Sequence, residues 1–194
     1  VDIVEKLLEN NADVEKCDKN GKSPLYVACL YGKVDVVKLL MTAGADVNKS
    51  NPFEKSPLFI ACEKGELGVV EILIANNANV NKLSKSGKLP LHIAVEHGYN
   101  EIVKILVENK SEIEQQDGDG CSALLIACVH SQFEAAKILI NCGARLDVVD
   151  KQGRSLFYWC INKANIPIFT LLIEKGASVN EVNNLDQTPL YYAI

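Results

Sequence analysis

The chain has 194 residues, of which 48% are apolar and 23% are charged, a composition typical of folded globular proteins rather than disordered ones. No apolar run approaches the roughly 18 residues that would span a bilayer, and no segment resembles a signal peptide. The formal net charge of −5 argues against nucleic acid as a partner, because proteins that bind nucleic acid concentrate positive charge. The first residue is Val1 and the single methionine is Met41, so we expect the chain to be part of something longer.

Apolar residues recur at a constant spacing along the whole sequence, without a change of phase. One series of large apolar residues starts at Val14, a second starts at Leu25, and small residues follow the second series three positions later. The period of about 33 residues indicates a repeat protein, in which each unit buries its apolar face against the next unit. The second series consists of Leu25, Leu58, Leu91, Leu124, Phe157 and Leu190.

Each unit predicts a turn followed by two helices. In the first full unit a polar turn ends near Gly21, and Ser23-Pro24 then gives the cap and the first position of a helix that ends at Gly32. A second helix over 34–41 has one apolar face and ends at Gly44. No segment alternates as a strand would, so the sequence predicts an all-α fold.

These residues resemble the ankyrin repeat, whose first helix begins with the motif T-P-L-H-x-A. The motif is matched at 23–28, 56–61, 89–94 and 188–193, and the repeat ending is matched by Gly44–Asn48 and Gly176–Asn180. The resemblance implies an α-solenoid of stacked ankyrin repeats, with helix-turn-helix units joined by β-turn fingers. We expect a single domain over 1–194, made of a half repeat at 1–17, full repeats at 18–50, 51–83, 84–116, 117–149 and 150–182, and the start of a further repeat at 183–194.

Two departures from the pattern lead to specific expectations. Glu54 stands where the fingers of the other full units have glycine, so we expect no left-handed residue there and a finger of different shape. Phe157, Tyr158 and Trp159 form the densest aromatic cluster. We interpret the cluster as a repacked core between repeats, with an exposed grip for a partner as the alternative.

The sequence gives no support for an enzyme, a metal site or a cofactor. The seven cysteines include no C-x-x-C pair, and Cys29, Cys62 and Cys128 recur at repeat spacing, which is typical of core residues. An odd number of unpaired cysteines favours an intracellular protein, most simply a cytoplasmic one. His97 and His130 occupy equivalent places in adjacent units, but no further ligand completes a metal set.

The resemblance implies that the protein is a rigid scaffold for protein–protein recognition, with its partner on the concave face of fingers and inner helices. Two alternatives stay open. The chain could be an architectural spacer or spring within a long solenoid, or it could be the substrate-recognition module of a ligase or other enzyme whose catalytic part lies elsewhere.

The candidate binding residues occupy the turn tips and the ends of the first helices, where the repeats vary. Basic residues outnumber acidic ones among them, which favours an acidic or extended peptide as the partner. We expect Tyr31 and Phe53 to share one continuous patch. The resemblance also marks Asn48 and Asn180 as places where ankyrin repeats are hydroxylated. The candidate binding residues are Lys19, Asn20, Lys22, Leu30, Tyr31, Phe53, Lys55, Glu63, Lys64, Lys85, Lys88, Glu96, His97, Val129, His130 and Arg154.

Overall fold

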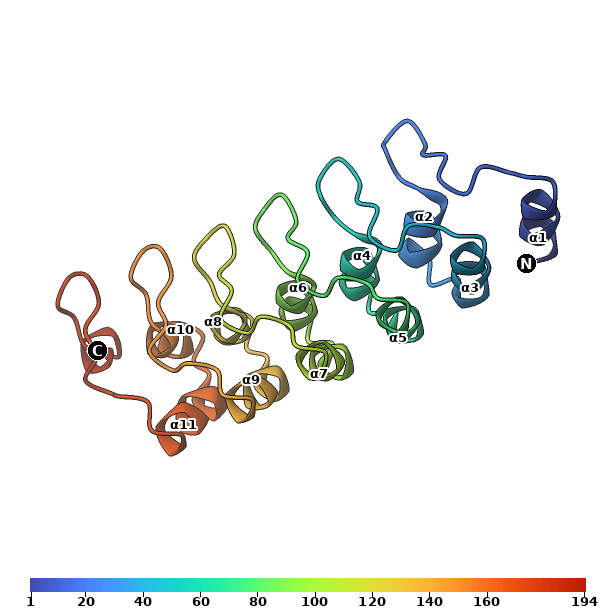
Figure 1. Cartoon of the computed structure of the whole chain (residues 1–194). Coiled ribbons are helices and arrows are strands. Elements are labelled where there is room, and N and C mark those ends of the chain that lie inside the picture. The colour runs from blue at the N-terminus through green and yellow to red at the C-terminus, as the bar shows by residue number, and fades with distance from the viewer. The chain divides into compact units, whose positions relative to one another are not determined.

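The computed structural model describes residues 1–194 and contains twelve helices (Figure 1). No strand is present, and the nearest approach to one is an isolated antiparallel bridge between Val149 and Ser155. The predicted all-α repeat fold is confirmed. The helices are α1 (Asp2–Glu9), α2 (Pro24–Leu30), α3 (Val34–Thr42), α4 (Pro57–Lys64), α5 (Leu67–Ala75), α6 (Pro90–His97), α7 (Asn100–Glu108), α8 (Ala123–Val129), α9 (Phe133–Asn141), α10 (Leu156–Asn162), α11 (Ile166–Glu174) and α12 (Pro189–Tyr192).

The first helix of most units begins at a serine that caps it. The side chains of Ser23, Ser56 and Ser122 each accept a hydrogen bond from the backbone N–H three residues later. Such a bond satisfies one of the donors that the first turn of a helix leaves free. At α6 the residue before the helix is Leu89, and its N–H donates to Nδ1 of His92 at 2.9 Å. His92 is fully buried, so the imidazole has a structural role there.

The chain leaves its helices through residues in the left-handed conformation. Gly44, Gly143 and Gly176 do so after the second helices, where the sequence predicts a helix end. Where the first helices of two later units lack glycine, Ser131 and Ala164 adopt the same conformation with φ of 57° and 50°. The repeat geometry therefore overrides the preference of the individual residue.

A polar side chain at the start of each finger holds the turn together. The Oδ1 atom of Asp18 accepts from the N–H groups of Asn20 and Lys22, and Asn51 does the same for Phe53 and Lys55. These are Asx-type turns, in which a side chain imitates a backbone carbonyl. Asp117, Asp150 and Asn183 repeat the arrangement in the later fingers.

The prediction of a different finger at Glu54 is wrong. Glu54 has a φ of 58°, in the left-handed region, as Gly21 has at 70° in the preceding finger. The backbone bonds also match, because the N–H of Glu54 donates to the carbonyl of Asn51 and the N–H of Gly21 donates to that of Asp18. The hydrogen bonds to Asn51 outweigh the cost of about 1–2 kcal/mol for an L-residue in this conformation.

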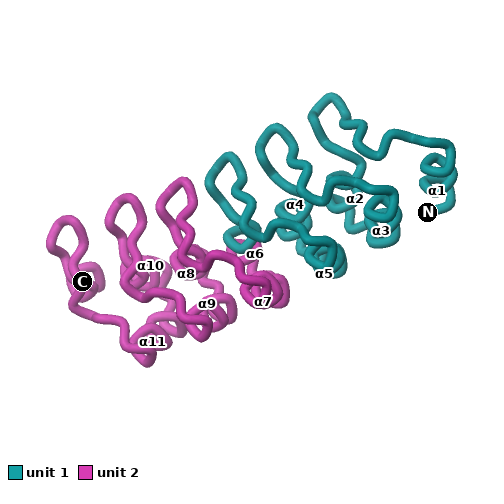
Figure 2. The backbone as a smooth tube through the Cα atoms, in the orientation of Figure 1, with its two compact units in different colours: residues 1–93 teal, residues 94–194 magenta.

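The chain divides into two compact units, Val1–Ile93 and Ala94–Ile194, with the division inside α6 (Figure 2). In the first unit α2 packs against α3 and α4, and α3 also contacts α1 and α5. Figure 1 shows the fingers of this unit projecting beyond the helices on the side of α2 and α4. Leu25, Leu58 and Leu73 are completely buried in its core.

In the second unit α8 packs against α9 and α10, and α10 also contacts α11 and α12. The aromatic cluster divides between core and surface. Phe157 is buried with its ring 4.9 Å from that of Phe169, whereas Tyr158 and Trp159 are half-buried. The core interpretation therefore describes Phe157. The guanidinium of Arg154 lies 5.8 Å from the ring centre of Tyr158 and 4.4 Å from that of Trp159.

Candidate protein-binding site

A hollow of about 570 Å³ lies among three successive fingers of the first unit and is here called the finger hollow. The first finger contributes Lys22, and the aromatic ring of Phe53 comes from the tip of the second. The hollow is lined by Lys22, Tyr26, Asn51, Phe53, Lys55, Ser84, Lys85 and Ser86. Four of the predicted binding residues, Lys22, Phe53, Lys55 and Lys85, thus come together in one place.

The buried side of the finger hollow is fixed by hydrogen bonds. Tyr26 and Asn51 are both buried, and Nδ2 of Asn51 donates to the Tyr26 hydroxyl at 3.3 Å. Burial raises the pKa of Tyr26, and the charge of Glu63 raises it further. The phenol is therefore neutral at physiological pH and takes part as a hydrogen-bonding group.

The open side of the finger hollow is basic and carries one exposed ring. Phe53 is 65% exposed, and Lys85 is exposed beside it in the lining. Lys55 forms an ion pair with Glu63, with 2.7 Å between Nζ and Oε1, and its Nζ lies 5.2 Å from the ring centre of Phe59. The lining contains three lysines and no carboxylate, so it is positively charged, although the Asp18 carboxylate lies near Lys22 in the same finger.

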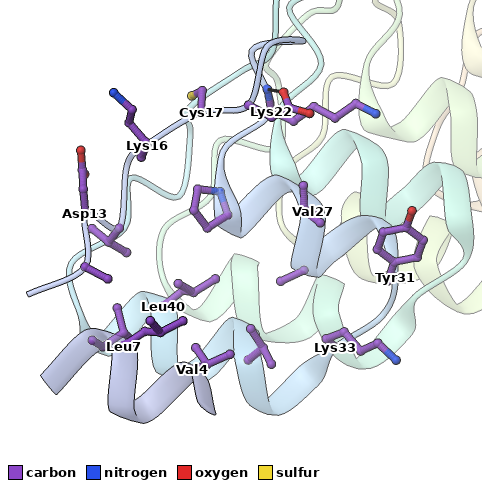
Figure 3. A pocket seen from close by; sticks show the side chains of 17 residues that line it. Val4, Leu7, Asp13, Lys16, Cys17, Lys22, Val27, Tyr31, Lys33 and Leu40 are labelled. Carbon is purple, nitrogen blue, oxygen red and sulfur yellow. Dashed lines mark hydrogen bonds between the residues drawn. The ribbon is translucent and has the colours of Figure 1, made fainter. Parts of the chain in front are cut away.

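Tyr31 does not line the finger hollow. It lies at the C-terminal end of α2, 64% exposed, and borders a second hollow beside α1 (Figure 3). The two hollows share only Lys22 among the residues that line them. Tyr31 and Phe53 therefore line different hollows, which adjoin at Lys22, and the single patch expected from the sequence stays a prediction.

None of the sixteen predicted residues is buried. Lys19, Asn20 and Lys64 are exposed outside the finger hollow. Leu30 and Lys88 are half-exposed, and so are Glu96 and Val129 in the second unit.

The remaining predicted residues of the second unit interact with neighbouring side chains. His97 is exposed, with its ring centre 5.7 Å from that of Tyr99, and His130 is also exposed. Arg154 bonds to the buried Asp150 through Nε at 2.6 Å and lies 4.4 Å from the ring centre of Trp159. Within residues 1–194 no group of three or more His, Cys, Asp or Glu side chains could hold a metal ion.

The family relationship follows from the sequence as a whole. A family model described as "Ankyrin repeats (3 copies)" matches residues 1–51, 41–117, 58–150 and 124–194. The chain belongs to the ankyrin-repeat family. Ankyrin repeats are generally modules for protein–protein interaction and are typically not catalytic. A search of curated proteins found no match. No helix is both long enough and apolar enough to cross a membrane.

The ankyrin repeats of this chain are also joined by a series of bonds between their loops, here called the loop ladder. The Asn48 side-chain oxygen accepts from the N–H of Asn79 at 2.8 Å, and Glu15 accepts in the same way from the N–H of Asp46 at 2.7 Å. In the second unit Glu114 accepts from the N–H of Arg145 at 2.9 Å. Each bond links residues 31 apart, from one ankyrin repeat to the next.

The two predicted hydroxylation sites differ in exposure and in bonding, because only Asn48 takes part in the loop ladder. Asn48 is half-buried, and its side chain is occupied by the bond to Asn79. Asn180 is exposed, and its backbone N–H donates to Oγ of Ser178. An enzyme would have to open the ladder to reach Asn48, whereas Asn180 can be reached directly.

Sequence reasoning missed Tyr26, Asn51, Ser84 and Ser86, which line the finger hollow. A signal for two of them was present in the repeat spacing. Asn51 and Ser84 belong to a polar series that begins at Asp18 and recurs once in every repeat, as a turn-forming position should. Tyr26 gave no such signal, because a tyrosine at the fourth place of the motif, where the family has His, is equally typical of a core residue.

Proposed function

We propose that this ankyrin domain recognises a partner protein by binding an extended acidic segment in the finger hollow. The observation that carries the proposal is one exposed aromatic ring, Phe53, set among lysines from three fingers in a hollow of about 570 Å³. Aromatic side chains are the usual anchors of protein interfaces, and a charged surround selects partners of opposite sign.

The rigidity of the fingers supports this function. The N–H of Lys85 donates to the carbonyl of Phe53 at 3.0 Å, which ties the second finger to the third. Asn51 holds its own finger closed through two further bonds. A partner would meet a surface that is already ordered, so little conformational entropy is lost when the partner binds.

Recognition fits the fingers better than a purely architectural role does, because a spacer needs no basic hollow with an exposed ring at its edge. A substrate-recognition module of a larger enzyme would use the same hollow. Identification of an enzyme as the partner would favour this form of recognition. We place the protein inside the cell, most simply in the cytoplasm. All seven cysteines are free, as a reducing compartment would keep them.

A panel of labelled extended peptides tests the proposal. Each peptide carries a run of Asp and Glu, with or without one Leu or Phe, and binding is measured by fluorescence anisotropy at two salt concentrations. We expect acidic peptides with the apolar residue to bind best. Phe53→Ala should weaken them by about tenfold, which corresponds to roughly 1.4 kcal/mol. Lys85→Ala should reduce both the affinity and its dependence on salt.

Lys38→Ala is the matched control, because Lys38 is an exposed lysine of the same unit that neither lines the hollow nor belongs to the candidate binding residues. It should leave binding unchanged. Equal binding by the parent and by both Phe53→Ala and Lys85→Ala would show that the hollow is not the site. Loss of binding in Tyr31→Ala alone would move the site to the surface beside α1. If no acidic peptide binds, the architectural role becomes the better proposal.

A further inference from the structure

Two thiols of the second unit are in contact inside its core. Cys128 lies in α8 and Cys160 lies in α10, and these two helices pack against each other. The thiol of Cys128 is hydrogen-bonded to that of Cys160. Cys128 is completely buried, Cys160 is 1% exposed, and neither takes part in a disulfide. The thiol pair therefore connects the first helices of two consecutive ankyrin repeats.

The repeat register shows that this thiol pair is an exception. Cys29 and Cys62 occupy the place of Cys128 in repeats of the first unit, and both are completely buried. The place of Cys160 belongs to the series of small residues in the first helices, whose other members are Ala28, Ala61, Ala94, Ala127 and Ala193. Cys128 is therefore the one cysteine at its place whose counterpart in the next repeat is also a cysteine.

The pKa values of the three buried thiols agree with this difference. Burial alone raises the pKa of Cys29 to about 12, and burial alone also raises the pKa of Cys62. The hydrogen bond with Cys160 is the main cause that raises the pKa of Cys128, and burial adds to it. Cys128 is therefore a neutral thiol at physiological pH, held against the sulfur of Cys160.

A small cavity leads to one member of the thiol pair. Its volume is about 210 Å³, and Cys160, Ile166 and Phe169 are among the residues that line it. Ile166 is 73% exposed, so the cavity borders the protein surface. Hydrogen peroxide fits a space of this size, since a water molecule occupies about 30 Å³ in the liquid. Cys128 does not line the cavity, so an oxidant that enters it meets Cys160 first.

We propose that Cys128 and Cys160 form a reversible redox site, in which a peroxide converts the two thiols to a disulfide that joins α8 to α10. The Cys160 sulfur bonds to one peroxide oxygen, the O–O bond breaks, and the other oxygen leaves as water with the thiol proton. The product is a sulfenic acid. The Cys128 sulfur then attacks the sulfenic sulfur, an S–S bond replaces the S–O bond, and the hydroxyl leaves as water with the Cys128 proton. The two thiols lose two electrons in total, which the peroxide gains, and a dithiol reductant reverses the change.

The position of Cys160 in the repeat favours this bond. A disulfide holds its sulfur atoms about 2.0 Å apart and needs two backbones that lie close together. The alanines at the same place in the other repeats are the small residues that such close packing of first helices requires. The disulfide would close the chain between α8 and α10, so it should stabilise the repeats at 117–149 and 150–182 against unfolding.

Peptide mass spectrometry of the oxidised chain tests the proposal. The parent for this experiment carries Cys142→Ser, which removes an exposed cysteine that can link two molecules. The folded chain is treated with hydrogen peroxide, and the remaining thiols are blocked with N-ethylmaleimide in urea. We expect a link between Cys128 and Cys160 with the loss of two hydrogens, while Cys29 and Cys62 are recovered as blocked thiols. The melting temperature should rise by several degrees, and dithiothreitol should restore the original value.

Two variants separate the steps. Cys160→Ala gives this repeat the alanine of the others, so it should fold, leave Cys128 as a free thiol and abolish the rise in melting temperature. Cys128→Ala should stop the reaction at the sulfenic acid of Cys160, which dimedone traps, whereas the parent should trap little.

Free thiols at both Cys128 and Cys160 in the oxidised, folded parent would overturn the proposal. Equal oxidation of Cys29 and Cys62 would also overturn it, because these thiols are as buried but have alanine at the place of Cys160. A link that forms only in urea would show that the folded thiol pair is not a redox site. The finger hollow lies in the first unit, so peptide binding there is a separate result.

Discussion

Asn48 and Asn79 lie 31 residues apart, and the side-chain oxygen of the first accepts a hydrogen bond from the backbone N–H of the second at 2.8 Å. The bond connects the loops of two consecutive ankyrin repeats. The equivalent bonds from Glu15 and Glu114 show that a carboxylate serves in the same place. The position therefore requires an oxygen that can accept a hydrogen bond.

Asn48→Ala removes the acceptor and should lower the free energy of unfolding by about 0.5–1.5 kcal/mol, the usual net worth of one hydrogen bond. Asn48→Asp keeps an acceptor and should recover most of the loss. Asn180→Ala is the control and should change stability little, because no ladder bond to the Asn180 side chain forms within the single chain. Urea unfolding at low protein concentration measures all three. Equal losses for Asn48→Ala and Asn48→Asp would contradict the role of the acceptor.

Glu54→Gly should stabilise the protein by about 0.5–1 kcal/mol. Glycine avoids the cost of an L-residue with φ near 58°, and part of this gain is offset by the greater flexibility of the unfolded chain. Gly21→Ala at the same place in the preceding finger should do the opposite and cost more than about 1 kcal/mol. A Cβ there would lie 2.6 Å from Cδ of Pro52. Thermal and urea unfolding compare the pair, and a destabilised Glu54→Gly would mean that the Glu54 side chain makes a contribution of its own.

The free energy of unfolding should fall as the pH rises above about 8.5, the ordinary pKa of a cysteine thiol. Burial raises the pKa of Cys29 to about 12. Below about pH 8.5 the thiol is protonated in both states, whereas between about 8.5 and 12 only the unfolded chain ionises, so the stability is progressively lost. The slope should approach about 1.4 kcal/mol per pH unit for each buried thiol. Burial likewise raises the pKa of Cys62.

Urea unfolding at about pH 8 and at about pH 9.5, still well below the raised pKa, measures this loss. Cys29→Ala should reduce the difference between the two conditions. Cys142→Ala should leave it unchanged, because Cys142 is exposed. If Cys29→Ala and Cys142→Ala reduce it equally, burial of the thiol is not the cause.

Asparagine hydroxylation, where it occurs, should be found at Asn180 in preference to Asn48. The Asn48 side chain is half-buried and held in the loop ladder, whereas Asn180 is exposed. Peptide mass spectrometry of protein produced in animal cells would locate an added oxygen. Added oxygen at Asn48 with none at Asn180 would mean that the hydrogen bond of the loop ladder does not protect Asn48. Protein without any added oxygen would show that neither asparagine is hydroxylated.

The sequence by itself determined the family, the all-α fold and the ends of most helices, because each of these depends on residues close together in the chain and recurs in every repeat. Ser23-Pro24 starts a helix and Gly44 ends one, as their counterparts do in other units. The residues of the binding surface could be predicted from the sequence only in part. The variable positions of the repeats indicate Lys22, Phe53, Lys55 and Lys85, which line the finger hollow, whereas Tyr31 lines the neighbouring hollow.

Only the tertiary structure decided how residues a repeat or more apart meet. Glu54 adopts the conformation of a glycine because Asn51 and the neighbouring finger fix its backbone, and the sum of those bonds exceeds the local cost. The finger hollow depends on the distance between successive fingers, and the loop ladder depends on the alignment of successive loops. Local preference sets the elements of a repeat protein, whereas the stacking of its repeats sets its surfaces.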